Sequence, residues 1–265
     1  MSNTGHTMLD KNLTHALNLP AGNDVFLRAD WQAPARVRTL ISTRAGGVSQ
    51  GAYAGLNIAT HVGDQAEHVT RNRAIVQAQI PVPLAYLNQV HGNAVVAAAD
   101  SLNEPLSADA SVNHDGTAAC AVMTADCLPV LFCDRAGTVV AAAHAGWRGL
   151  AGGVLQNTLT AMNVPAVEIM AWLGPAIGAE AFEVGQDVYD AFCTDDIKAQ
   201  SAFQPIAQGK YLADIYALAR LVLQREGVTQ ISGGQHCTVL ERERFYSYRR
   251  DRQTGRMVSA IWLEN

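Results

Sequence analysis

The stretch that decides the fold is CAVMTADCLPVLFCDRAGTVVAAAHAGWRG, residues 120–149. It contains short apolar runs separated by the Asp126-Cys127 pair and by a turn, and these runs are residues 120–123, 130–133 and 138–143. Short apolar runs bounded by turn residues are typical of buried strands. The stretch therefore predicts three strands, with Cys127 in a bend before Pro129 and His144 at the end of the third strand.

Strands and helices mix irregularly on either side of this stretch. Residues 36–43 alternate like a strand and run into the glycine-rich turn 44–49. Apolar spacing and turn residues predict helices at 66–79, 149–162, 185–192 and 212–226. Further strands are predicted at 84–90, 94–98, 168–173, 230–232, 245–248 and 258–263. The mixture lacks the strict alternation of a doubly wound sheet, so it favours an α+β fold.

The chain of 265 residues has no repeat or linker, so we expect a solvated tail at 1–23 and one domain at 24–265. The net charge is −5 without a basic block, which argues against nucleic acid as a partner. No apolar run has membrane-spanning length, and residues 1–30 lack the apolar core of a signal peptide. The five cysteines lack disulfide-like spacing. These features predict a cytoplasmic protein with reduced thiols and no membrane contact, and we expect a monomer.

Three side chains that can bind metals lie at the ends of apolar runs: His91, Cys127 and His144. Two imidazoles and a thiolate are three of the four ligands that zinc prefers, and an open fourth position is typical of catalytic zinc. Gly146 and Gly149 follow His144 and would permit a close approach of the backbone. The residues therefore predict a zinc centre with room for a water molecule, whose pKa would fall toward ~7.

Two other chemistries use the same side chains. Two histidines and a cysteine also form blue-copper centres, for which Met123 would be the weak axial ligand. A cysteine activated by a histidine base is a nucleophile that needs no metal. A multicopper oxidase is disfavoured because its centres need roughly ten histidines, whereas this chain has eight. The residues alone leave zinc, copper and the metal-free nucleophile open.

Arginines beside glycines form two candidate anion sites. Arg148 stands four residues after His144 at the start of a predicted helix, where free N–H groups and a guanidinium would hold an anion. The segment 44–47, Arg-Ala-Gly-Gly, is either a second anion site or a hairpin turn. The run 246–251 interleaves aromatic and cationic side chains and would stack on a planar ring or cap a strand with a salt bridge. The spacing of the arginines in 71–73 favours a solvated helix face.

Long segments of the sequence resemble the YfiH-like family, also called the polyphenol oxidase or laccase-domain family. These segments are the opening stretch 120–149, LNQVHG at 87–92, AWLGPAIG at 171–178, STRAGGVS at 42–49, LNIATHVGD at 56–64, and FYSYRRD with TGRM between 245 and 257. The likeness runs from Val37 to Leu263. It implies mixed β-sheets packed together with helices outside, and one zinc ion bound by His91, Cys127 and His144.

The resemblance also implies a purine nucleoside phosphorylase. Adenosine or inosine would react with phosphate to give the free base and ribose 1-phosphate, and methylthioadenosine cleavage and adenosine deamination would accompany this reaction. Some relatives are called peptidoglycan editing factors, so an amidase acting on a cell-wall precursor through zinc or Cys127 is one alternative. A copper-binding polyphenol oxidase or redox protein is the other.

Roles for individual residues follow from the chemistry of these reactions. Phosphorolysis needs a site that binds the phosphate anion, and we assign Arg44 and Arg148 to phosphate or ribose oxygens. Deamination needs a carboxylate for proton transfer, and Asp109 or Asp126 would serve, unless either one instead holds the imidazole of a metal ligand. The catalytic candidates are therefore Cys127, Asp126, Asp109 and Arg148.

Overall fold

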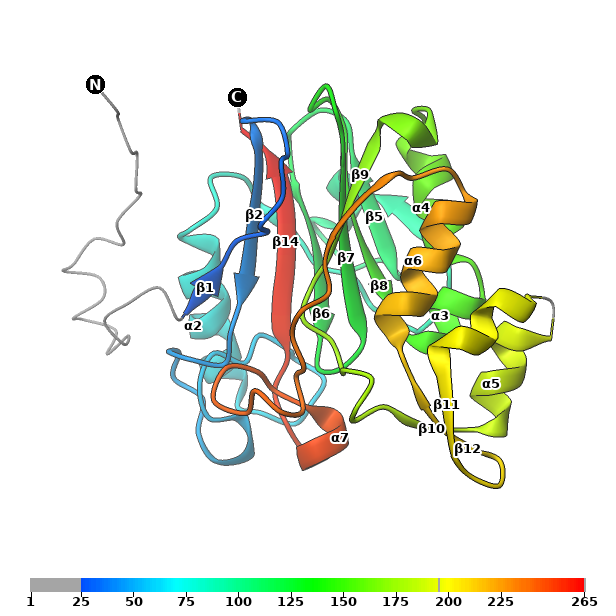
Figure 1. Cartoon of the computed structure of the whole chain (residues 1–265). Helices are drawn as coiled ribbons and strands as arrows, with labels where there is room; N and C mark the ends of the chain where they lie inside the picture. The colour runs from blue at the N-terminus through cyan, green and yellow to red at the C-terminus, as the bar shows by residue number, and fades with distance from the viewer. Residues whose placement is uncertain (1–24, 195, 265) are drawn as a thin grey trace, which may run out of the picture.

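Two β-sheets packed face to face form the centre of the molecule in a computed structural model, which describes residues 25–194 and 196–264. Figure 1 shows the two sheets side by side. The strands of the first sheet, in spatial order, are β1 (Phe26–Leu27), β2 (Val37–Ser42), β14 (Met257–Leu263), β6 (Ala119–Thr124) and β3 (Leu84–Ala85). The strands of the second are β13 (Gln230–Gly233), β9 (Ile169–Leu173), β7 (Leu128–Asp134), β8 (Val140–Ala145), β5 (Ala110–Asn113) and β4 (Val95–Ala97).

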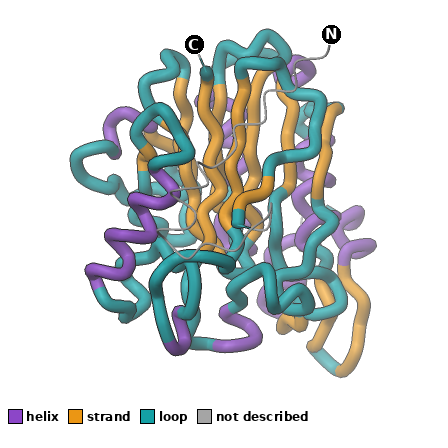
Figure 2. Tube along the Cα trace, turned by 90° about the vertical axis from the view of Figure 1, so that its left-hand side faces the viewer, coloured by secondary structure: helices purple, strands orange, loops and turns teal. Residues whose placement is uncertain are grey.

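Helices cover the outer faces of both sheets (Figures 1 and 2). The first sheet is covered by α2 (Ala66–Gln77). Beside the second sheet lie α3 (Trp147–Ala151), α4 (Val154–Met162), α5 (Gln186–Cys193) and α6 (Ile215–Arg225). A small third sheet has the order β10 (Glu183–Gly185), β12 (Lys210–Ala213) and β11 (Phe203–Ala207), and a short helix, α7, spans Tyr248–Asp251. Single 3₁₀ turns occupy Gly51–Tyr53, Ala98–Ser101, Ala166–Glu168 and Ile197–Ala202.

The strands of the opening stretch are apolar throughout because both of their faces are buried. In β8, Val140 and Ala142 point into the cluster between the two sheets, whereas Ala141 and Ala143 point toward the helices. Successive side chains of a strand lie on opposite faces, so a strand between two layers needs apolar residues at every position. The prediction of an α+β fold with packed mixed sheets and helices outside is confirmed.

Three predicted elements differ in the structure. The expected helix 149–162 breaks at Gly152-Gly153, where Gly153 has a φ of 92°, into α3 and α4. The expected strand 84–90 ends at Ala85, and the Gln89 side-chain amide then exchanges hydrogen bonds of 2.7 and 2.8 Å with the backbone of Met123. A side-chain amide thus takes the place of a strand partner at this edge.

The expected strand 245–248 was wrong. Phe245 and Tyr246 are buried in a loop, and Ser247 begins α7 by accepting a hydrogen bond from the N–H of Arg250. A serine at this position satisfies a helix N–H that has no backbone partner, which stabilises helix rather than strand. The prediction of a tail at 1–23 lies outside the described residues, and within them no helix is long and apolar enough to cross a membrane.

Candidate metal centre

The three predicted metal ligands come together at one end of the sheets. Strand β6 ends at Thr124 and β7 begins at Leu128, so Cys127 lies in the bend that joins the two sheets. Strand β8 runs antiparallel to β7 and pairs His144 with Pro129, which brings His144 to the same end. His91 lies in the loop between β3 and β4. The pairing of strands therefore assembles ligands that are far apart in sequence.

The distances between the ligand atoms fit a tetrahedral metal ion. Cys127 Sγ lies 3.7 Å from His91 Nε2, and the ligand atoms of all three residues lie within 4.8 Å of one another. The imidazole rings of His91 and His144 meet edge to face, with centroids 4.8 Å apart. A zinc ion with ordinary bond lengths would separate a thiolate sulfur from an imidazole nitrogen by about 3.6 Å. The donor set and its spacing therefore fit zinc.

The backbone at two of these positions adopts conformations that non-glycine residues rarely take. His91 has a φ of 60° and Asp126 a φ of 89°. Such conformations cost about 1–3 kcal/mol each and persist where surrounding contacts hold them. At Asp126 the carbonyl accepts the N–H of Ile177, and the carboxylate accepts the Thr238 hydroxyl and the Arg249 N–H, both at 2.6 Å. These contacts fix the bend that presents Cys127.

Asp109 organises both histidines. It lies just before β5, beside His144 on β8, and it is fully buried. One carboxylate oxygen lies 2.8 Å from His144 Nδ1 and accepts the N–H of His91 at 3.0 Å, and the other accepts the N–H groups of Gly92 and Val90. Burial alone would raise the pKa of this carboxyl, but the hydrogen bonds from His144 and Gly92 bring the net shift downward. The carboxylate stays charged and leaves Nε2 of His144 as the metal-binding nitrogen.

The geometry separates the two roles considered for the carboxylates. All four hydrogen bonds of Asp109 hold His144 or the loop of His91, and both oxygens of Asp126 hold neighbouring segments. A carboxylate whose oxygens already accept hydrogen bonds from fixed donors is poorly suited to take up and release a proton during catalysis. The contacts therefore favour a positioning role for Asp109 and Asp126.

Cys127 and His144 shift each other's pKa in the directions that favour a thiolate beside an imidazolium. Burial by itself would raise the pKa of the Cys127 thiol, but the neighbouring charge and hydrogen bond of His144, with a contribution from His91, lower it to about 6. Burial would likewise lower the pKa of His144, but the thiolate and the hydrogen bond to Asp109 raise it to about 9. Between these values a thiolate faces an imidazolium, so this thiol is the reactive one.

The first prediction concerns the alkylation of the metal-free protein. The rate of Cys127 modification by iodoacetamide is expected to rise as the pH passes about 6 and to level off near pH 7, because only the thiolate reacts. An ordinary thiol would still be gaining rate at pH ~8. The measurement is peptide mass spectrometry over a pH series, with and without zinc, which should shield the sulfur. A midpoint near 8.5 would contradict the ion pair.

The buried cysteines provide an internal control for this experiment. Burial raises the pKa of Cys120 and of Cys133 to about 12, and burial also raises the pKa of Cys193. These thiols should remain unmodified under conditions that label Cys127 completely.

Two glycines allow the ligand loops to approach the start of α3. A Cβ atom at Gly146 would lie 3.0 Å from Cys127 Sγ and 3.1 Å from His91 Cδ2. A Cβ atom at Gly149 would lie 2.7 Å from the carbonyl oxygen of Gly92. The close approach expected at both glycines is confirmed, against two ligand side chains at Gly146 and against the backbone of the His91 loop at Gly149.

The second prediction is that Gly146→Ala weakens metal binding about tenfold while the fold is retained. The backbone at Gly146, with φ −60° and ψ 155°, accepts any residue, so the effect should come from the added methyl alone. Overpacking of this kind typically costs about 1–3 kcal/mol, and the strain is relieved by displacing the sulfur or the imidazole. Zinc affinity measured by chelator competition tests this, with thermal unfolding of the metal-free protein as the control. Unchanged affinity would contradict the contact.

The two predicted anion-binding arginines occupy different surroundings. Arg148 is exposed at the start of α3, and its guanidinium lies 4.4 Å over the ring of Trp147. Arg44 donates a hydrogen bond to the carbonyl of Arg242 and lies over the ring of Tyr246 at 5.0 Å. Arg148 is thus free to reach a ligand beside His144, whereas Arg44 would have to give up its hydrogen bond.

Residues not assigned to the site by sequence also lie at this end of the sheets. Arg256 stands immediately before β14, whose first residue pairs with Thr124, and so lies level with Ala125 near the ligand bend. Arg73 on α2 lies with its guanidinium 4.0 Å over the ring of Tyr86. Arg256 belongs to the motif TGRM, which distinguishes it in the sequence. Nothing in the local pattern distinguishes Arg73 from a solvated arginine.

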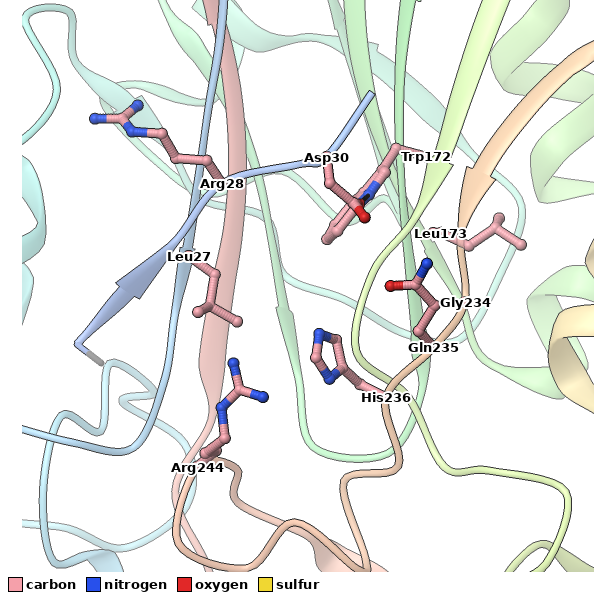
Figure 3. Close-up of a pocket in the computed structure, with 10 residues that line it drawn as sticks. Leu27, Arg28, Asp30, Trp172, Leu173, Gly234, Gln235, His236 and Arg244 are labelled. Carbon is pink, nitrogen blue, oxygen red and sulfur yellow. Dashed lines mark hydrogen bonds between the residues drawn. The ribbon is translucent and has the colours of Figure 1, made fainter. Parts of the chain in front are cut away.

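A cavity of about 220 Å³ lies elsewhere and contains none of the metal ligands. Figure 3 shows it between the segment around Arg28 and the segment of His236. Three of its polar side chains already have partners: His236 and Arg244 contact Glu241, and Asp30 accepts the indole N–H of Trp172. We therefore place the functional site at the ligand cluster rather than in this cavity.

The fold and the ligand cluster define a single-domain α+β protein with a three-residue metal-binding arrangement at the end of two packed sheets. A family model described as multi-copper polyphenol oxidoreductase laccase matches residues 38–264. The chain belongs to this family. The description mentions copper, but the donor set that the described residues bring together is one group of three ligands.

Similar proteins carry a more specific description. The chain is 51% identical over 243 residues to a Pseudomonas aeruginosa protein named purine nucleoside phosphorylase, covering 91% of this chain and all of that protein. It is 52% identical over 236 residues to the Escherichia coli purine nucleoside phosphorylase YfiH, covering 88% of this chain and 96% of that one. A crystal structure of a Neisseria meningitidis protein of the DUF152 family superimposes with a TM-score of 0.90 at 68% identity, covering 91% of this chain and all of that one.

Proposed function

We propose that this protein is a zinc-dependent purine nucleoside phosphorylase. The observation that carries the proposal is the convergence of His91, Cys127 and His144, with their nearest ligand atoms spaced for a tetrahedral ion, in a chain similar over its domain to proteins named purine nucleoside phosphorylase. Three protein ligands leave one coordination position for a substrate. The substrates are a purine nucleoside and inorganic phosphate.

The reaction breaks one bond and makes another at the same carbon. A phosphate oxygen bonds to C1′ of the ribose as the bond from C1′ to the base nitrogen breaks, and the electron pair leaves with the base. The base gains a proton and the phosphate loses one, so the products are the free base and ribose 1-phosphate. Positive charge develops on the ribosyl group, so the site has to stabilise an oxocarbenium-like carbon and hold the anion against it.

Different residues of the site would meet these requirements. His91, Cys127 and His144 would hold the zinc ion, which when bound supplies a Lewis-acid centre with an open position. Asp109 keeps both histidines in place and keeps Nδ1 of His144 protonated. Arg148, exposed four residues after His144, would contact ribose or phosphate oxygens. For Arg44 the same role requires release from the carbonyl of Arg242.

We extend the proposal to three nucleosides and to one side reaction. Adenosine, inosine and methylthioadenosine share the purine and the glycosidic bond that the reaction cleaves, and differ at C6 and at the 5′ position. Adenosine deamination would be a side activity at the same metal centre. The carboxylates of Asp109 and Asp126 are occupied by structural hydrogen bonds, so we expect deamination to be the slower reaction.

The test is a product analysis of adenosine turnover by the zinc-loaded protein, with and without inorganic phosphate. Adenine and ribose 1-phosphate, formed only with phosphate, are the expected products. Inosine formed without phosphate would mean that deamination dominates. No product in either case would contradict the proposal and favour amide hydrolysis on a cell-wall precursor. The bound metal is determined in the same preparation, since copper with visible colour would instead indicate a redox protein.

A further inference from the structure

A second cluster of cationic and polar side chains lies beside the metal ligands, and the reaction steps above do not use it. We name it the Arg73–Arg256 cluster, and its members are Arg73, Arg256, His61 and Tyr86. They come from α2, the start of β14, the loop before α2 and the end of β3. Both arginines are half-buried. Two half-buried cations in one place are unexpected in a chain whose net charge is −5.

The backbone of Ile58 contacts both arginines, one through its carbonyl oxygen and the other through its N–H. The Nε of Arg73 donates a hydrogen bond of 2.8 Å to the carbonyl oxygen of Ile58, and the carbonyl oxygen of Arg256 accepts the N–H of the same residue. The backbone N–H of Arg256 is further anchored on the side-chain oxygen of Asn57 at 2.9 Å. These contacts hold the guanidinium of Arg73 beside the backbone of Arg256, and the charges of both arginines act on His61, although the two residues are far apart in sequence.

Neither guanidinium is paired directly with a carboxylate within the described part of the chain. The ion pairs found there include no carboxylate partner for Arg73 or Arg256. Burial lowers the pKa of Arg256, and the nearby charges of Cys127 and Asp126 oppose that shift, so these two groups lie beside the cluster without a direct ion pair. Arg256 uses one terminal nitrogen on the carbonyls of Thr254 and Gly255, and its other terminal nitrogen has no acceptor among the described residues. Burial lowers the pKa of His61, and the charges of Arg256 and Arg73 lower it further. Half-buried, like-charged groups held together without a counter-ion are typical of an anion site.

A buried hydroxyl in the same place also lacks a partner. The ring of Tyr86 lies under the guanidinium of Arg73, and its hydroxyl oxygen is buried without a hydrogen-bond partner among the described residues. Buried hydroxyl groups are normally hydrogen-bonded, because leaving one unsatisfied is unfavourable. Burial raises the pKa of Tyr86 to about 12, so the group remains a donor at neutral pH. An anion bound between the arginines would supply the missing acceptor.

The position of the cluster relates it to the metal ligands. Met257 pairs with Thr124 across β14 and β6, so Arg256 lies level with Ala125, two residues before Cys127. Strand β3 runs parallel to β6 and pairs Ala85 with Cys120, so Tyr86 lies level with Ala121, and the chain continues from it toward the ligand end of the sheet. An anion held by Arg256 would therefore lie beside a substrate at the metal centre. Tyr248, which is 50% exposed with its ring 5.9 Å from Arg256, borders the same region.

We propose that the Arg73–Arg256 cluster binds the inorganic phosphate that attacks C1′ of the nucleoside. The inference rests on the proposed phosphorylase function and adds the residues that hold its anionic substrate. Two guanidinium groups match the oxygens of a phosphate, and the Tyr86 hydroxyl adds a neutral donor. Phosphate bound here leaves Arg148, at the start of α3, for the ribose oxygens.

The test compares Arg73→Gln, Arg256→Gln and Tyr86→Phe with Arg71→Gln in the zinc-loaded protein. Arg71 is exposed on the same helix and serves as the matched control. We expect the KM for phosphate to rise about 10-fold or more in each arginine variant and less in Tyr86→Phe, with the KM for inosine within about twofold. Arg73→Lys should recover part of the phosphate affinity, because it keeps the charge but not the paired donors.

Calorimetric titration of inorganic phosphate without nucleoside separates failure of this inference from failure of the proposed function. Ribose 1-phosphate formation with an unchanged KM for phosphate in both arginine variants would overturn the phosphate subsite while the phosphorylase stands. If the wild-type protein forms no ribose 1-phosphate, the proposed function fails, and the titration then decides. Phosphate binding that is lost in Arg73→Gln and Arg256→Gln but kept in Arg71→Gln supports the anion site, and no binding to the wild type overturns it.

Discussion

Replacing Cys127 with alanine is expected to remove bound zinc and to abolish turnover while leaving the fold largely intact. The thiolate is one of three protein ligands, and zinc binding to a full protein site is worth about 10–16 kcal/mol. Loss of one ligand should therefore cost several kcal/mol, which is more than hundredfold in affinity. The side chain is partly exposed, so alanine should change the stability of the metal-free protein by less than about 1 kcal/mol.

The measurement is zinc stoichiometry by elemental analysis, together with turnover of inosine and phosphate. Cys193→Ala is the matched control, because Cys193 is a buried thiol at the end of α5, outside the ligand cluster. That variant should keep its zinc and its activity. A Cys127→Ala protein with full zinc and wild-type turnover would remove Cys127 from the ligand set.

Asp109→Asn should have the next largest effect, because one carboxylate holds both histidine ligands. An amide keeps the shape of the side chain but brings an N–H₂ group against groups that are themselves donors, at His144 Nδ1, His91 and Gly92. Substituting a partner that orients a metal ligand typically costs about 10–100-fold in affinity or activity. The buried donors left without an acceptor should also lower the free energy of unfolding by about 1–3 kcal/mol.

Asp134→Asn separates the effect on the metal from the effect on stability. Asp134 is also buried and also accepts backbone N–H groups, from Thr138 and Val139, but it stands at the other end of β7 from Cys127. Chemical denaturation should show similar losses for the two variants, whereas chelator competition should show weaker zinc binding for Asp109→Asn alone. Equal zinc affinity in both variants would reduce Asp109 to a structural residue.

The ligands of the candidate centre were predictable because each carries a local signal. His144 ends an apolar run and is followed by small residues, and Cys127 interrupts another run before a proline. The choice of these side chains is a matter of residue chemistry, which the sequence states directly. The approach of Gly146 to the ligands was predictable for the same reason, since glycine next to a ligand permits contacts that a side chain would block.

The region 245–251 shows where local pattern was insufficient. Its aromatic residues favour a strand, yet Tyr246 is buried in a loop and its hydroxyl bonds to the carbonyls of Tyr53 and Ala54. Those partners lie 193 and 192 residues away in sequence. No local rule anticipates a contact over that separation, and Ser247 then begins a helix.

The sequence by itself determined the class of fold, the strands of residues 120–149 and the three metal-ligating side chains, because periodicity and residue chemistry are local properties. Only the tertiary structure decided that Asp109 holds the histidines rather than carrying a proton, since that depends on the register of β5 against β8. The same holds for the Arg73–Arg256 cluster. Its arginines become neighbours because both contact the backbone of Ile58. A backbone contact of this kind does not depend on the side chain of Ile58, so the local sequence does not predict it.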